Sequence, residues 1–155
     1  MSRWRAKDYK HVFKAVRKMI SVRWKTIVSD YESALWRAVR ECFPGVKHLG
    51  CYLHWSQAVL RHLRCDAGLQ NAFQSDAAVR KVCKLLFALP FLPADDIIAV
   101  YERIERKAQR LRDYATQVLE LCTYVRQNWL ESGVWSPDRW SVFQLPVRTN
   151  NDCGG

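Results

Sequence analysis

The sequence predicts an α/β fold that is predominantly helical. Two short apolar runs, residues 24–29 and 46–53, alternate with helical patterns, which is the order of elements in a parallel α/β layer. After about residue 66 the pattern is almost purely helical. The chain has 155 residues, of which 49% are hydrophobic, so one domain with a buried core is expected. We expect a single unit over residues 1–155, made of an α/β part at 1–65, a helical part at 66–132 and a tail at 133–155.

The α/β part begins with a helix whose apolar side chains recur at helical spacing. They are Tyr9, Val12, Phe13, Val16 and Ile20. The β-branched run 24–29 predicts a strand, after which Ser29 or Asp30 can cap a helix that Pro44-Gly45 ends. Residues 46–53 predict a second strand, and a helix is expected from 54 to about 64. Such a crossover puts the C-terminal ends of both strands at one edge, so Asp30 should lie near the element that runs from Cys51 to His54.

The helical part contains a long apolar seam. Residues 94–132 hold neither proline nor glycine, and apolar positions recur at alternating spacings of four and three. The seam consists of Ile97, Tyr101, Ile104, Ala108, Leu111, Ala115, Val118, Cys122, Val125 and Trp129. It predicts one very long helix or two helices that keep register. Packing against other helices of the same domain, such as one at 76–89, suits its small residues better than a self-standing coiled coil, and self-association or a partner helix remains an alternative.

Composition narrows the function classes. No apolar run is long enough to cross a membrane, and no hydrophobic signal region follows the basic first residues, so neither a membrane protein nor a secreted one is indicated. The six cysteines are scattered, which favours a reduced, intracellular protein.

Positive charge is concentrated at the N-terminus. The net charge is +10, and residues 1–25 hold nine Lys or Arg against one acid, a net of +8. We expect this arm and helix to contact DNA phosphates, although a solvated helix face is an equal alternative. The candidate DNA-binding residues are Arg3, Arg5, Lys7, Lys10, Lys14, Arg17 and Lys18.

Three short motifs occur in a characteristic order. They are Ser29-Asp30-Tyr31-Glu32, Gly50-Cys51-Tyr52-Leu53-His54-Trp55 and Arg148-Thr149-Asn150-Asn151. Together they resemble the C-terminal part of the catalytic domain of Mutator-like (MULE) DNA transposases. The resemblance implies a ribonuclease-H-like fold, a Mg²⁺-dependent Asp-Asp-Glu site, DNA as the partner and a nuclear location. In that family a helical insertion separates the second Asp from the final Glu, and residues 66–132 match it.

The same resemblance shows where this chain departs from the family. Asp30 corresponds to the second catalytic, metal-binding Asp, while Glu32 is expected to be exposed. Arg148, Asn150 and Asn151 correspond to the motif that introduces the final Glu, but the aligned position here is Gly154. The family's first Asp precedes the region covered by this chain. We therefore expect a truncated unit of about two strands, no tight Mg²⁺ binding and no catalysis by this chain alone.

Cys51 and His54 allow several interpretations. The resemblance makes them a polar element beside the metal site. They could instead be half of a zinc site completed by His48, His62, Cys42 or Cys65, although none of these has paired-ligand spacing. A Cys–His nucleophilic pair is a further alternative, but no third residue that would orient it is evident. A buried Cys and a hydrogen-bonded His are the simplest alternative.

The resulting functional hypothesis is a fragment of a Mutator-like transposase, inactive as this chain. The alternative is a non-catalytic DNA- or protein-binding module derived from a transposase. A helical interaction protein unrelated to transposases would rest on the 97–129 seam alone.

Overall fold

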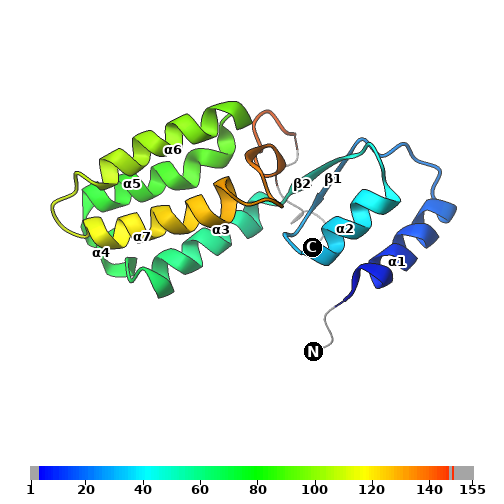
Figure 1. Ribbon diagram of the computed structural model, residues 1–155, viewed down its shortest axis with the longest axis horizontal. Helices are drawn as coiled ribbons and strands as arrows, with labels where there is room; N and C mark the ends of the chain where they lie inside the picture. Colours follow the sequence, from blue (N-terminus) through cyan, green and yellow to red (C-terminus); the bar gives the residue numbers. More distant parts are fainter. Residues whose placement is uncertain (1–3, 147, 149–155) are drawn as a thin grey trace.

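The computed structural model describes residues 4–146 and 148, and it consists of a small α/β part and a larger helical bundle (Figure 1). The α/β part contains α1 (Ala6–Met19), β1 (Thr26–Ser29), α2 (Ser33–Cys42) and β2 (Lys47–Gly50). The bundle contains α3 (Tyr52–Arg61), α4 (Gln70–Ser75), α5 (Ala77–Ala88), α6 (Ala94–Ala108) and α7 (Ala115–Val125). Single π-helical turns at His62–Asp66 and Arg126–Leu130 continue α3 and α7, and 3₁₀ turns occupy Leu89–Phe91 and Pro137–Arg139. The prediction of a predominantly helical α/β chain is confirmed.

β1 and β2 form a parallel pair in which Thr26 lies opposite Lys47 and Ser29 opposite Gly50. Both strands are shorter than the runs 24–29 and 46–53 predicted, because the ladder ends where Cys51 becomes the residue before α3. The parallel crossover through α2 is as predicted.

The start of α2 differs from the prediction. The residue that directly precedes this helix is Glu32 and not Ser29 or Asp30, and the Glu32 side chain makes no capping hydrogen bond. The backbone carbonyl of Asp30 instead accepts a hydrogen bond from the indole Nε1 of Trp36, at 2.7 Å. Trp36 is thereby fixed over the sheet, and it is 5% exposed.

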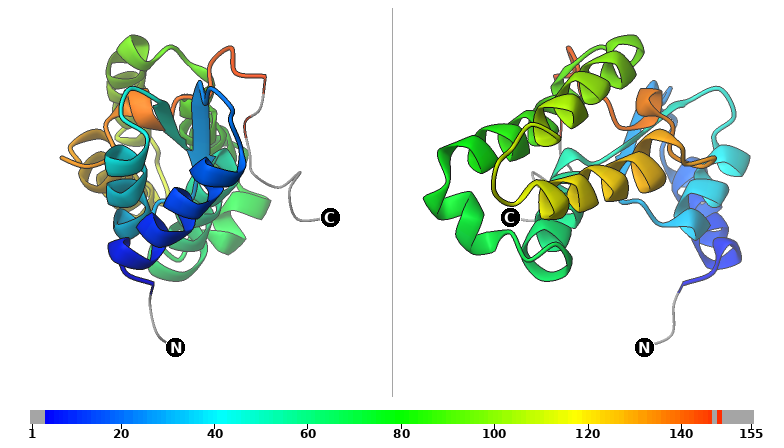
Figure 2. Two further views of the ribbon diagram at one scale, coloured as in Figure 1. Left: turned by 90° about the vertical axis from the view of Figure 1, so that its right-hand side faces the viewer. Right: turned by 60° about the vertical axis from the view of Figure 1, so that its left-hand side comes forward.

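α1 packs against α2 and lies at the outer side of the α/β part (Figure 2). Its predicted apolar stripe is only partly covered, since Tyr9, Phe13 and Val16 are half-buried whereas Val12 and Ile20 are exposed. A small cluster of Val39, Cys42 and Phe43 forms the buried core beneath it. This core is much smaller than that of the bundle.

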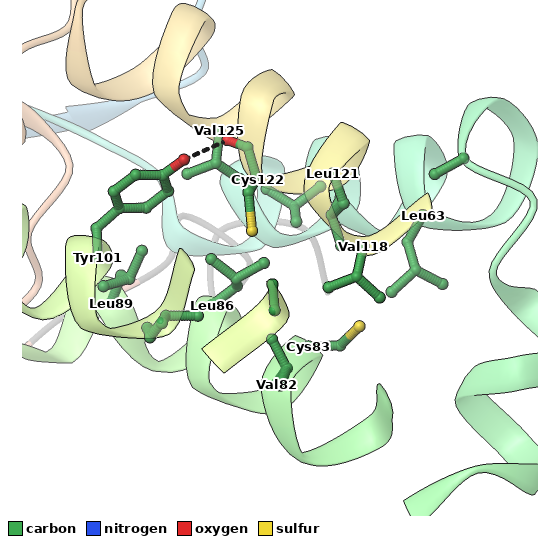
Figure 3. Close-up of a cluster of buried hydrophobic side chains, with 14 of the residues drawn as sticks. Leu63, Val82, Cys83, Leu86, Leu89, Tyr101, Val118, Leu121, Cys122 and Val125 are labelled. Carbon is green, nitrogen blue, oxygen red and sulfur yellow. Dashed lines mark hydrogen bonds between the residues drawn. The ribbon is translucent and has the colours of Figure 1, made fainter. Parts of the chain in front are cut away.

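The bundle core contains the predicted seam. α6 and α7 are two separate helices joined by residues 109–114, so the single long helix is wrong and the two-helix form is correct. Ile97, Tyr101, Ile104 and Ala108 from α6 are buried together with Val118, Cys122, Val125 and Trp129, and Leu111 and Ala115 are half-buried. α5 supplies Val82, Cys83 and Leu86 to the same core, as Figure 3 shows. The chain's own helices therefore cover the seam, which leaves self-association through it unsupported.

Tyr101 ties α6 to α7 inside this core. Its hydroxyl donates a hydrogen bond to the carbonyl of Cys122 at 2.8 Å (Figure 3). Burial raises the pKa of the Cys122 thiol to about 12 and that of Cys83 to about 11, so both stay protonated and behave as apolar core residues.

The two parts meet where Tyr31 packs over Gly50. A Cβ added at Gly50 would overlap the ring and hydroxyl of Tyr31. The ring cannot move aside easily, because Trp129 and Trp135 lie edge-on to it at centroid distances of 4.7 and 5.7 Å. Only glycine permits this close approach.

We predict that Gly50→Ala destabilises the protein by about 1 to 3 kcal/mol, because the new methyl group overpacks the junction. Urea unfolding of the full chain measures the change. Gly133→Ala is a matched control, since no atom lies within 4 Å of its added Cβ, and it should change stability by less than about 0.5 kcal/mol. Equal stability of Gly50→Ala and the parent chain would contradict the packing described.

Candidate functional site

The C-terminal edge of the sheet brings together side chains from two separated motifs. Asp30 follows the last residue of β1, and His54 lies in the first turn of α3, directly after β2. His54 Nδ1 is 3.0 Å from Asp30 Oδ1. The predicted meeting of Asp30 with the Cys51–His54 element is confirmed, and its cause is the parallel crossover.

The Asp30–His54 contact is a partly solvated charge contact. The side chains are 49% and 37% exposed, and Nδ1 makes no hydrogen bond of good geometry. The two side chains attract each other when the imidazole is protonated, and solvent screening keeps the contribution of this contact to stability small.

Arg148, from the third motif, reaches the same edge of the sheet. Its backbone carbonyl accepts a hydrogen bond from the N–H of Tyr52 at 3.0 Å, at the start of α3. Its guanidinium lies over the ring of Phe91, 5.4 Å from the centroid. Asn150 and Asn151, like Arg3, lie outside the described residues.

Cys51 is fully buried, and its backbone rather than its thiol shapes the site. Its N–H donates to the carbonyl of Ser29 at 2.8 Å, extending the ladder by one bond, and its carbonyl accepts from the N–H of Trp55. The other zinc candidates are spread through the fold. His62 pairs with Asp66, Cys42 lies in the α1–α2 core and Cys65 is exposed. Among residues 4–146 and 148 no three His, Cys, Asp or Glu side chains gather as a metal site would need.

Glu32 is half-buried, whereas the sequence led us to expect an exposed side chain. Its carboxylate accepts a hydrogen bond of 2.6 Å from the hydroxyl of Tyr9 on α1. This hydrogen bond, with added contributions from burial and from the charges of Glu32 and Asp30, raises the pKa of Tyr9 to about 12. Glu32 thus anchors the N-terminal turns of α1 to the edge of the sheet.

A buried polar pair that sequence reasoning missed joins the two strands. Ser29 Oγ lies 2.7 Å from Nε2 of His48, and the Trp36 ring stacks on that imidazole at a centroid distance of 3.9 Å. The guanidinium of Arg139 also lies over the Trp36 ring, 5.6 Å from its centroid. Burial, and secondarily the charge of Arg139, lower the pKa of His48 to about 4. No sequence motif marked this group, because its members come from four separate elements.

The predicted DNA-binding residues differ in what their side chains contact. Lys10 forms an ion pair with Glu41, and Arg17 donates to the carbonyl of Cys42 at 2.6 Å, so both hold α1 against α2. Arg5 precedes the helix, and its backbone N–H donates to the carboxylate of Asp8. Lys7, Lys14 and Lys18 are exposed at helical positions i, i+7 and i+11, which places them on one face of α1. We call these three residues the lysine face.

One protein-family model matches the part of the chain that contains Asp30 and His54. It is described as the MULE transposase domain and matches residues 1–58, which span α1 to most of α3. The chain is related to the MULE transposases. No curated protein and no solved structure matches it.

Among residues 4–146 and 148, no group of carboxylates gathers around Asp30 as the Mg²⁺ site of a MULE transposase would need. Two ions held for phosphodiester chemistry need several carboxylate oxygens directed at one point. Within the described ranges, the Asp30 carboxylate lies 3.0 Å from His54 Nδ1. The carboxylate of the neighbouring Glu32 accepts a hydrogen bond from the hydroxyl of Tyr9.

Across residues 4–146 and 148, every helix is too short or too polar to traverse a lipid bilayer.

We predict that His48 makes stability depend on pH. Its folded pKa of about 4 lies below the ordinary value of 6.5, so the unfolded chain binds a proton that the folded chain does not. The free energy of unfolding should therefore decrease as the pH falls from about 6.5 to about 4.

His48→Gln isolates this contribution, because every other titrating group is shared with the parent chain. The stability advantage of the parent over His48→Gln, measured by urea unfolding at a series of pH values, should shrink on acidification through that window. A constant difference would show that His48 titrates normally.

Proposed function

We propose that this chain is a part of a MULE-type DNA transposase that holds DNA and is not by itself a nuclease. The observation that carries the proposal is the position of the lysine face, which lies within the region matched by the MULE transposase domain. A nuclear location and a ribonuclease-H-like ancestry of the β1–α2–β2 unit are part of the same proposal.

The lysine face is suited to duplex DNA. Its three ammonium groups lie opposite Tyr9, Phe13 and Val16, the side chains that pack toward α2, so they project from the molecule. No ion pair with a described residue engages them, in contrast to Lys10. Contacts of this kind neutralise phosphates without reading bases, so binding should be salt-dependent and independent of sequence.

The catalytic part of the proposal rests on Asp30. Asp30 aligns with the family's second metal-binding Asp, and its carboxylate lies 3.0 Å from His54 Nδ1. Two Mg²⁺ ions need several carboxylate ligands, and among the described residues no group of three His, Cys, Asp or Glu side chains gathers as a metal site would need. Cleavage and strand transfer would then require acidic residues supplied from elsewhere in a complete transposase.

We predict that Lys7→Gln, Lys14→Gln and Lys18→Gln together weaken duplex binding by the full chain. Each lost phosphate contact should reduce the slope of log K against log salt by about 1, a total of about 3. Fluorescence anisotropy with a labelled duplex between about 50 and 200 mM NaCl measures both affinity and slope.

The matched control replaces three exposed lysines of the bundle, Lys81, Lys84 and Lys107, by Gln. It removes the same charge from α5 and α6 and should leave most of the affinity in place. Equal losses in both triple variants would mean that net charge alone binds DNA, and the role of α1 would be wrong.

A further inference from the structure

A second basic surface lies between the two parts of the fold, away from the lysine face. A cleft of about 1030 Å³ is bounded by α2 and β2 on one side and by residues 133–143 on the other. Those residues form the orange segment that passes between the bundle and the sheet in Figure 1. The volume is at the upper limit of the roughly 300 to 1,000 Å³ usual for small-ligand pockets, so a larger or extended ligand fits better.

The lining of this cleft is strongly cationic. Arg37, Arg40, Lys47 and Arg139 line it, and Asp138 is the only carboxylate among its described lining residues. Arg37 lies 3.4 Å from Glu41, whereas Arg40 and Lys47 are exposed and form no ion pair with a described residue. Four cations and one carboxylate favour a polyanion.

The cleft also offers one accessible aromatic ring. Trp36 cannot serve, because it is only 5% exposed and the His48 imidazole already stacks on its ring. Phe143 lines the same cleft, and its side chain is 42% exposed.

The turn that carries Phe143 is firmly held. The N–H of the neighbouring Val142 donates to the carbonyl of Pro90 at 2.7 Å, and the hydroxyl of Ser141 donates to that of Leu92 at 2.6 Å. The ring is therefore presented to the cleft by a turn whose backbone and Ser141 hydroxyl are hydrogen-bonded to the segment that follows α5.

We propose that this cleft, which we call the cationic cleft, binds single-stranded DNA, with one unpaired base stacked on Phe143 and phosphates held by Arg40 and Lys47. Aromatic rings among cations are the usual means of holding single strands, because every unpaired base presents a face for stacking. A duplex hides those faces within its own stack, so it suits the lysine face instead. The proposal extends the function proposed above to unpaired strands and commits to DNA because of the MULE relationship.

The test measures binding of the full chain to fluorescein-labelled oligothymidylate of about 15 nucleotides, within the range of single-strand site sizes. Phe143→Ala should weaken this binding at least about fivefold, as expected for loss of one stacked base, whereas Phe143→Trp should retain it. The pair Arg40→Gln and Lys47→Gln should also weaken it and flatten its salt dependence. The control pair Arg103→Gln and Lys107→Gln removes equal charge from the exposed face of α6 and should have little effect.

Parallel titrations with a duplex and with oligouridylate of the same length separate the outcomes. The proposal is supported if the cleft variants lose affinity for single-stranded DNA and keep their affinity for the duplex. This outcome does not depend on the result for the lysine-face variant. Unchanged single-strand affinity in Phe143→Ala would overturn it while leaving duplex binding by α1 intact. Tighter binding to oligouridylate than to oligothymidylate would overturn the assignment to DNA.

Discussion

The packing of Tyr31 over Gly50 is the contact on which the arrangement of the two parts depends. Two parallel strands covered by α2 bury too little apolar surface to be stable alone, and the core cluster beneath α1 consists of Val39, Cys42 and Phe43. The Tyr31 ring connects this part to the bundle through Trp129 and Trp135. The hydroxyl of Tyr31 is buried without a hydrogen-bond partner among the described residues, so the junction depends on ring packing and not on polar pairing.

The same junction adjoins the contact between Asp30 and His54. Tyr31 directly follows Asp30, and Gly50 directly precedes Cys51, so the contact fixes the ends of both strands where His54 meets Asp30. The cationic cleft lies between β2 and the segment that carries Arg139. The lysine face lies on α1, which packs mainly against α2 and is held to Glu32 through Tyr9.

Local sequence patterns predicted which helices and strands form better than they predicted where each helix or strand begins and ends. The crossover and the meeting of Asp30 with His54 followed from strand order, and the buried seam of α6 and α7 followed from its periodicity. The turn at 109–114 was not located, because it contains neither glycine nor proline. It closes instead with Tyr114 in the left-handed region at φ 61°, a conformation that a tyrosine rarely adopts. The separation of Lys10 and Arg17 from the lysine face depends on where α2 lies, and no pattern within α1 contains that information.

Hydrogen exchange in Tyr31→Ala tests the role of the junction most directly. We predict that backbone amides of residues 27–29 and 47–50 lose most of their protection, while those of residues 118–125 in α7 keep theirs. Tyr31→Phe removes only the hydroxyl that has no described partner and should behave like the parent chain. Undiminished protection of both strands in Tyr31→Ala, or an equal loss in α7, would contradict the account.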